Sequence, residues 1–171
     1  MATKRWPDFR SHVIVAARKK KANKPLTSFH VSATAGWRTL LTDISGSSAV
    51  YPGGVISYAY EVKHALLGVD EALLREQGAV CAEAAKQMAE GVRDRLGADY
   101  GVASTGIAGP GSDEFDRPVG LVYLAVAGGD STRVYEHRFS GTRAAVRRQA
   151  ASMALEHLLE HIMQRSDADL R

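Results

Sequence analysis

The sequence predicts an α/β protein in which helices cover both faces of a mixed β-sheet. Strand-like and helix-like segments alternate up to residue 104, and a β-hairpin pattern follows near residues 119–139. The chain has 171 residues, of which 45% are hydrophobic, so it is long enough to bury one core. We therefore expect one globular domain without internal repeats or linkers.

The pattern of apolar residues gives the expected elements in chain order. They are a helix at 8–21, a strand at 26–32, a helix at 34–44, a strand at 55–58, helices at 61–67, 71–77 and 81–96, a strand at 99–104, strands at 119–127 and 133–139, and a helix from 142 to about 164.

Local signals set the bounds of the elements in the first half. Apolar residues recur at helical spacing between Phe9 and Ala17, and Pro25 ends this first helix. Polar and apolar residues alternate in the first strand. A Gly-Ser-Ser run from Gly46 breaks the second helix, and two glycines from Gly53 lead into the next strand.

Capping and turn residues set the bounds in the second half. Gly68 stops one helix, Asp70 is the expected N-cap of the next, and Gly78 ends that helix. The Gly-Gly-Asp turn at 128–130 joins the two hairpin strands, and Thr142 begins the last helix. The polar tail at 166–171 is expected to fray.

Charge is distributed unevenly along the chain. Residues 1–24 contain eight Lys or Arg residues and one acid, whereas the whole chain has a net charge of only +3. We therefore divide the chain into a basic N-terminal helix or arm at 1–24, a globular domain at 25–165 and a tail at 166–171. A solvated helix end is favoured over a nucleic-acid contact for the arm, because no aromatic residues interleave with its lysines.

Composition also restricts the compartment and the cofactors. The single cysteine, Cys81, excludes a disulfide framework and a thiolate-rich metal site. Its position indicates a helix N-cap. The sequence predicts neither a membrane span nor a signal peptide, so we expect a cytoplasmic protein.

A glycine-rich loop follows the strand that ends at Ser104. It contains three glycines and a proline between Gly106 and Gly111, and the chain returns to an apolar run at Val119. Glycines let backbone amides turn inward and let a ligand approach closely. Because α/β proteins place their sites at strand ends, this loop is a candidate binding loop.

Three residues at or after strand ends form a candidate nucleophilic system. Ser32 ends the first expected strand, Tyr58 ends the second, and Lys63 lies in the following helix. A desolvated lysine, or a tyrosinate beside one, can take the proton of a serine, and helix-start amides can stabilise an oxyanion. Taken singly, these residues are also explained as a cap, a half-buried strand residue and a surface charge.

The last helix contains a histidine pattern that is also found in one class of zinc peptidases. His157 and His161 form an H-x-x-E-H arrangement and share a helix face. The pattern lies near the chain end, and the histidines fall largely outside the apolar face of that helix. A surface helix is therefore preferred to a metal site, and no metal or cofactor is predicted.

With these residues in view, the chain resembles the CinA C-terminal domain family over residues 26–163. The segments that carry the resemblance are Thr42 to Ala49, Gly54 to Tyr58, Glu61 to Lys63, Leu67 to Val69, Gly78 to Val80, Thr105 to Pro110, Arg117 to Gly120, Phe139 to Gly141, Arg143 and Val146 to Gln149. The resemblance implies a three-layer α/β/α sandwich and an association into homo-oligomers.

The resemblance also implies a reaction, the deamidation of nicotinamide mononucleotide without a cofactor. The family's nucleophilic serine, tyrosine and lysine match Ser32, Tyr58 and Lys63. The small-molecule nucleotide would contact a set of binding residues, of which the arginines follow from charge rather than from a motif. This set is Thr34, Gly36, Thr105, Gly106, Gly109, Arg143 and Arg147.

The chain departs from the family pattern around the expected site. The family's Glu-Ser-Cys-Thr-Gly-Gly motif has Val31, Ala33 and Ala35 here in place of its glutamate, its cysteine and its first glycine. The usual Ser-Asn pair is Ala59-Tyr60. Two interpretations therefore stay open, namely an active amidohydrolase and a relative that binds a nucleotide with weakened or no catalysis.

Overall fold

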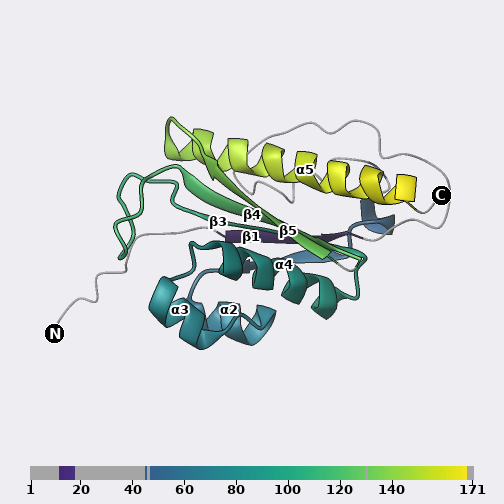
Figure 1. The fold of residues 1–171 in the computed structure, drawn as a ribbon, viewed down its shortest axis with the longest axis horizontal. Coiled ribbons are helices and arrows are strands. Elements are labelled where there is room, and N and C mark those ends of the chain that lie inside the picture. The colour runs from purple at the N-terminus through teal and green to yellow at the C-terminus, as the bar shows by residue number, and fades with distance from the viewer. Residues whose placement is uncertain (1–11, 18–44, 46, 130, 169–171) are drawn as a thin grey trace.

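The computed structural model describes residues 12–17, 45, 47–129 and 131–168, and it contains a five-stranded sheet (Figure 1). The strand order is β2-β1-β3-β4-β5. The strands are β1 (His12–Ala17), β2 (Gly53–Ser57), β3 (Tyr100–Gly106), β4 (Leu121–Gly128) and β5 (Ser131–Arg138). A short 3-10 helix, η1 (Ser47–Ala49), precedes β2.

Helices lie on both faces of this sheet. The helices are α2 (Tyr60–Leu67), α3 (Glu71–Gln77), α4 (Ala82–Leu96) and α5 (Arg143–Ala168). Figure 1 shows α5 on one face and α2, α3 and α4 on the other, with the sheet between them. The expected α/β class and its three layers are confirmed. None of the described helices is both long and apolar enough to cross a membrane.

The structure describes four strand pairings of the expected mixed sheet. All four described pairings, β1 with β2, β1 with β3, β3 with β4 and β4 with β5, are antiparallel. The strand expected at 26–32 and the helix expected at 34–44 lie outside the described residues. Over the part that the structure describes, the sheet is therefore antiparallel.

The helix predicted at residues 8–21 is wrong where the structure describes it. His12–Ala17 forms β1, which is paired on both sides, with β2 and with β3. The segment His-Val-Ile-Val-Ala-Ala is a continuous apolar run with three adjacent β-branched residues, which favours a central strand. Residues 12–17 thus belong to the sheet and not to a separate arm.

Two apolar cores fill the spaces between the layers. On one face, α4 packs small residues against the sheet, including Ala85 and Ala89, which are fully buried. On the other face, α5 packs Val146, Ala151 and Ala154 against β3 and β4. Small side chains on both helices allow a close approach of helix to sheet.

The caps expected from the sequence are present. The Asp70 carboxylate accepts hydrogen bonds from the amides of Ala72 and Leu73 at the start of α3. The Cys81 thiol accepts one from the Ala84 amide at the start of α4. Gly68 adopts the left-handed conformation, with φ of 70°, that ends α2.

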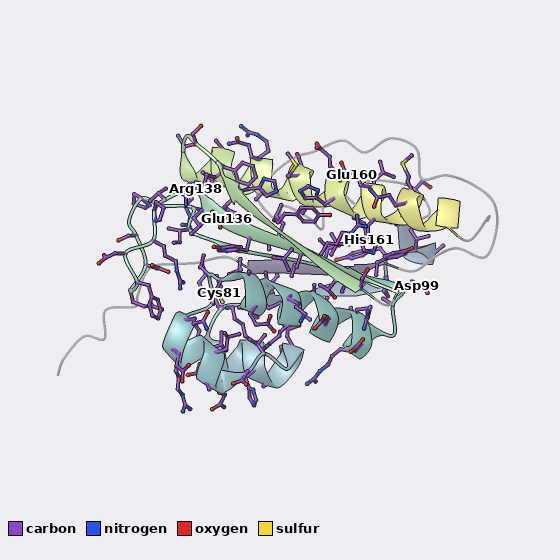
Figure 2. All side chains as sticks on the ribbon, viewed as in Figure 1. Cys81, Asp99, Glu136, Arg138, Glu160 and His161 are labelled. Atoms are coloured by element: carbon purple, nitrogen blue, oxygen red, sulfur yellow. The ribbon has the colours of Figure 1, made fainter. Side chains whose placement is uncertain are left out.

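The two histidines of the last helix are buried, which corrects the expectation that they lie outside its packed face. His157 is 9% exposed and His161 is 5% exposed. The His157 ring stacks on Tyr135 of β5, with ring centroids 3.6 Å apart. His161 lies 3.4 Å from the Gly128 carbonyl oxygen, and its ring makes an edge contact with Tyr100 (Figure 2). Both imidazoles therefore belong to the packing between α5 and the sheet.

We expect Gly91→Ala to destabilise the fold strongly. A Cβ atom at position 91 of α4 would lie 1.8 Å from the Leu67 carbonyl oxygen at the end of α2. Helices α2 and α4 must separate to make room for this atom, which should lower the free energy of unfolding by about 3 kcal/mol. This loss outweighs the gain from the better helix propensity of alanine. Urea denaturation measures the loss. The control Lys86→Ala, on the same helix, should change stability by less than about 0.5 kcal/mol.

We also expect stability to fall as the pH drops through the range where His137 titrates. The Nε2 atoms of His137 and His157 are 3.0 Å apart. Burial, and secondly His157, lowers the pKa of His137 below its ordinary value of 6.5. The unfolded chain therefore binds the proton more readily, and acid favours unfolding. Denaturation curves measured between pH 8 and pH 5 should show that the free energy of unfolding depends less on pH in His137→Gln than in wild type. An equal pH dependence in the two proteins would show that His137 is not the group responsible.

Candidate functional site

The register of the sheet brings several polar residues into one row across its strands. Ser57 pairs with His12 of β1, and the next residue of β1, Val13, pairs with Ser104. Thr105 therefore continues the row on β3, and it pairs with Tyr123 of β4. Directly opposite residues lie on the same face of a sheet. The Tyr123 ring packs against the core beneath α4, so the row faces the α2–α4 layer.

Lys63 is the most unusual residue of this region because its side chain is fully buried. It lies one turn into α2, four residues before the buried Leu67, and its chain runs back toward the end of β2. Its Nζ atom donates hydrogen bonds to the carbonyl oxygens of Ser57, at 3.1 Å, and Tyr58, at 2.6 Å. Burial disfavours the charged form of an amine, and the two carbonyls offset part of that cost.

Tyr58 follows β2 directly and is 38% exposed. Its described contact with Lys63 is made by its backbone carbonyl. A contact between the Tyr58 hydroxyl and the Lys63 amine stays a prediction. The expected nucleophile Ser32 and the binding residues Thr34 and Gly36 lie outside the described residues.

The structure joins the start of the glycine-rich loop to two helices. The buried Thr105 hydroxyl donates a hydrogen bond to the Ala79 carbonyl, just before α4. Gly109 has φ of +86°, a conformation that favours glycine, and its carbonyl accepts a hydrogen bond of 2.7 Å from Arg143 at the start of α5. Arg147, one turn further along α5, is partly buried. Of the predicted binding residues, Gly109 and Arg143 are thus in contact.

Gly106 has a packing role that its sequence position did not reveal. A Cβ atom at this position would lie 2.8 Å from the Leu121 carbonyl oxygen and 2.6 Å from the Val122 side chain. The end of β3 therefore approaches β4 too closely for a larger residue. This close packing is sufficient to require a glycine at position 106, so a role in ligand binding is not needed to explain it.

A buried ion pair that sequence analysis missed organises the rest of the loop. The Asp113 carboxylate accepts hydrogen bonds from the amides of Phe115, at 3.1 Å, and Arg117, at 3.0 Å. It also pairs with the Arg117 guanidinium at 3.3 Å, while its own side chain is 1% exposed. Arg117 in turn donates to the Gln77 carbonyl and lies over the Phe115 ring. The i,i+4 spacing of Asp113 and Arg117 within the loop is the sequence signal from which this ion pair could have been predicted.

Tyr60 provides a second attachment of the same loop. Its hydroxyl donates a hydrogen bond to the Glu114 carboxylate. The Phe115 ring lies so close to Gly78 that a Cβ atom there would be 2.5 Å from it. The loop at 107–120 is therefore attached to α2, to the end of α3 and to α5.

At the far end of the row, Tyr123 and Glu136 form a polar pair. The Tyr123 hydroxyl donates a hydrogen bond of 3.0 Å to Glu136, which also pairs with Arg138 at 3.4 Å. Burial, and then the bond to Glu136, raises the pKa of the Tyr123 phenol above its ordinary value. Figure 2 shows Glu136 and Arg138 at the end of the sheet toward which the start of α4, with Cys81, also points. This row and the loop together define the candidate site.

Comparison with protein families gives a match over most of the chain. The model of the CinA C-terminal domain family matches residues 11–162. A CinA-like protein of Acidobacterium capsulatum is 47% identical over 123 residues, which are 72% of this chain and 30% of that protein. One from Frankia casuarinae is 50% identical over 116 residues, 68% of this chain and 27% of that protein. The chain thus spans about a third of the length of these relatives.

Solved structures with the same fold include proteins described as competence/damage-inducible. The protein CihA from Agrobacterium tumefaciens is 40% identical, with a TM-score of 0.67 over 71% of this chain and 74% of that one. The competence damage-inducible protein A from Klebsiella pneumoniae is 28% identical, with a TM-score of 0.72 over 74% of this chain and 79% of that one.

We expect Asp113→Asn to destabilise the protein. The change removes the charge that neutralises Arg117 in a site where the carboxylate is buried, and it should cost about 2 kcal/mol. The same chemical change at the exposed Asp116, which has φ of 53°, should cost less than about 0.5 kcal/mol because asparagine tolerates that conformation. Urea denaturation compares the two variants, and equal losses would show that the ion pair is not the cause.

Proposed function

Because the chain belongs to the CinA C-terminal domain family, we propose that it is an amidohydrolase that converts nicotinamide mononucleotide to nicotinate mononucleotide and ammonia. The buried Lys63 at the β2–α2 junction is the observation that carries this proposal. A lysine without solvent is a suitable proton acceptor, because burial opposes its ammonium form. The match covers only 30% and 27% of the length of the two relatives, so the proposal concerns the activity of this domain.

The proposed reaction is an acyl transfer in two steps. Ser32 Oγ attacks the carboxamide carbon, and its proton passes to Lys63 with Tyr58 assisting. The C–N bond then breaks, and ammonia leaves with a proton returned from the same groups. Water next attacks the resulting ester, which releases the carboxylate and restores the serine. Backbone amides near Ser32 and in the loop are proposed to hold the oxyanion.

The substrate phosphate is proposed to bind near the start of α5. Arg143 and Arg147 are one turn apart on this helix, and an anion is favoured at a helix N-terminus. Arg143 also holds the Gly109 carbonyl, so it would link the phosphate to the loop that shapes the pocket. A cytoplasmic location and a homo-oligomer form part of the same proposal.

The second candidate function is nucleotide binding without turnover. Val31, Ala33 and Ala35 stand where the family motif has a carboxylate, a thiol and a glycine. In addition, the Tyr60 side chain, which replaces the usual asparagine, is bonded to the loop residue Glu114. Saturable binding of the mononucleotide without ammonia release would favour this candidate.

We expect the pure protein to release ammonia from nicotinamide mononucleotide and the Ser32→Ala variant to release none above background. Lys63→Met should lower kcat by a factor of about 100 or more, since the proton acceptor is lost. The matched control Lys86→Met, at a half-exposed lysine of α4, should keep wild-type activity. A coupled ammonia assay measures all four proteins, and equal rates for wild type and Ser32→Ala would reject the amidohydrolase.

A further inference from the structure

The proposed function does not use the histidine pattern of the last helix, and the structure gives one of its members a partner from the sheet. His161 lies 3.4 Å from the Gly128 carbonyl oxygen. His157, in contrast, meets His137 of β5, and the Nε2 atoms of these two rings are 3.0 Å apart. The cluster is therefore a pair of histidines between α5 and β5, and not the pair within one helix that the sequence pattern suggests.

Neighbouring aromatic rings hold both imidazoles of this pair in place. The His157 ring lies parallel to the Tyr135 ring, with 3° between their planes. The His137 ring stacks on Phe139, with ring centroids 5.2 Å apart. The two imidazoles are inclined by 28° to each other. Side chains that packing has already fixed lose little conformational entropy when they bind a ligand together.

A carboxylate determines which nitrogen of His157 carries the ring proton. The Nδ1 atom of His157 lies 3.3 Å from Oε2 of Glu160, one turn along α5 (Figure 2). An ionised carboxylate only accepts hydrogen bonds, so Nδ1 carries the proton and the neutral ring has its lone pair on Nε2. Histidines that bind metals commonly donate their other N–H to a carboxylate in this way. The Glu160 side chain is 60% exposed, so solvent reaches this part of the cluster.

The distance between the two Nε2 atoms is close to that of two ligands on one ion. In a tetrahedral zinc site each imidazole nitrogen is about 2.0–2.1 Å from the metal, which places two such nitrogens about 3.3 Å apart. In the absence of an ion, His137 Nε2–H donates to the lone pair of His157 Nε2. A neutral imidazole can carry its single proton on either nitrogen, so His137 can offer a lone pair at the same place.

We propose that His137 and His157 bind one transition-metal ion through their Nε2 atoms, with zinc as the best-suited ion. The ion replaces the proton between the rings, and His137 carries its ring proton on Nδ1 instead. Among the residues that the structure describes, no group of three His, Cys, Asp or Glu residues is placed to hold an ion. The two imidazoles are therefore the protein ligands, and water or an anion fills the remaining positions. A bound ion joins α5 to β5 and takes no part in the proposed amidohydrolase reaction.

Thermal denaturation at neutral pH, with and without Zn²⁺, tests this site. Saturating zinc should raise the thermal midpoint of the wild type by about 5 °C or more, because an ion that binds the folded state stabilises it. A chelator should reverse the shift. Mg²⁺ should cause no shift, because it prefers oxygen ligands. An unchanged midpoint together with no binding heat in a calorimetric titration with zinc would overturn the proposal.

Three variants show whether zinc binds at this pair. His137→Gln should lose the zinc-dependent shift, because one of the two ligands is removed. Glu160→Gln, a change at an exposed side chain, should weaken the zinc affinity about ten- to a hundredfold, because the carboxylate no longer orients His157. His64→Gln is the matched control, since His64 also lies beside a glutamate, 3.8 Å from Glu71, and it should bind zinc as wild type does.

The same calorimetric titration measures the zinc affinity of all four proteins. Wild-type affinity in His137→Gln would overturn the proposal, because the ion would then be bound elsewhere. An equal loss of affinity in His64→Gln and Glu160→Gln would also overturn it. These measurements need no substrate, so a failure of the proposed amidohydrolase activity leaves their outcome unchanged.

Discussion

The burial of Lys63 is the constraint around which the site is built. A primary amine without solvent needs hydrogen-bond acceptors, and the short connection between β2 and α2 supplies two carbonyls at the required place. This arrangement requires α2 to begin immediately after β2, with Lys63 one turn into the helix and Leu67 anchoring the same face. The position of α2 is thereby coupled to the end of the sheet where the polar row lies.

The loop at 107–120 is held together by another cation. The Arg117 guanidinium pairs with the buried Asp113 carboxylate. This ion pair orients Phe115 against Gly78 and ties the loop to the end of α3. The hydrogen bond from Arg143 to Gly109 attaches the other side of the loop to α5. The site is therefore bordered by elements from both layers of helices.

The sequence was sufficient where the signals are local, and it failed where distant partners decide. Asp70 and Gly68 predicted helix ends correctly, because capping involves residues within one turn. The apolar spacing around segment 12–17 is compatible with a helix, its β-branched residues favour a strand, and pairing with β2 and β3 decides for the strand. Likewise, spacing could not distinguish a surface lysine from the buried Lys63, nor show that Arg117 donates to the Gln77 carbonyl.

Lys63 and Arg117 differ in burial and in their partners. The buried Lys63 amine donates to the carbonyls of Ser57 and Tyr58, whereas the partly exposed Arg117 guanidinium pairs with the Asp113 carboxylate. A carboxylate holds its partner in the charged state, since loss of the proton would leave an uncompensated buried anion. Burial of the Lys63 amine disfavours its charged form, which is the property that a proton acceptor needs. An ion pair thus serves the structure of the loop, and a buried amine lies where the proposed chemistry needs one.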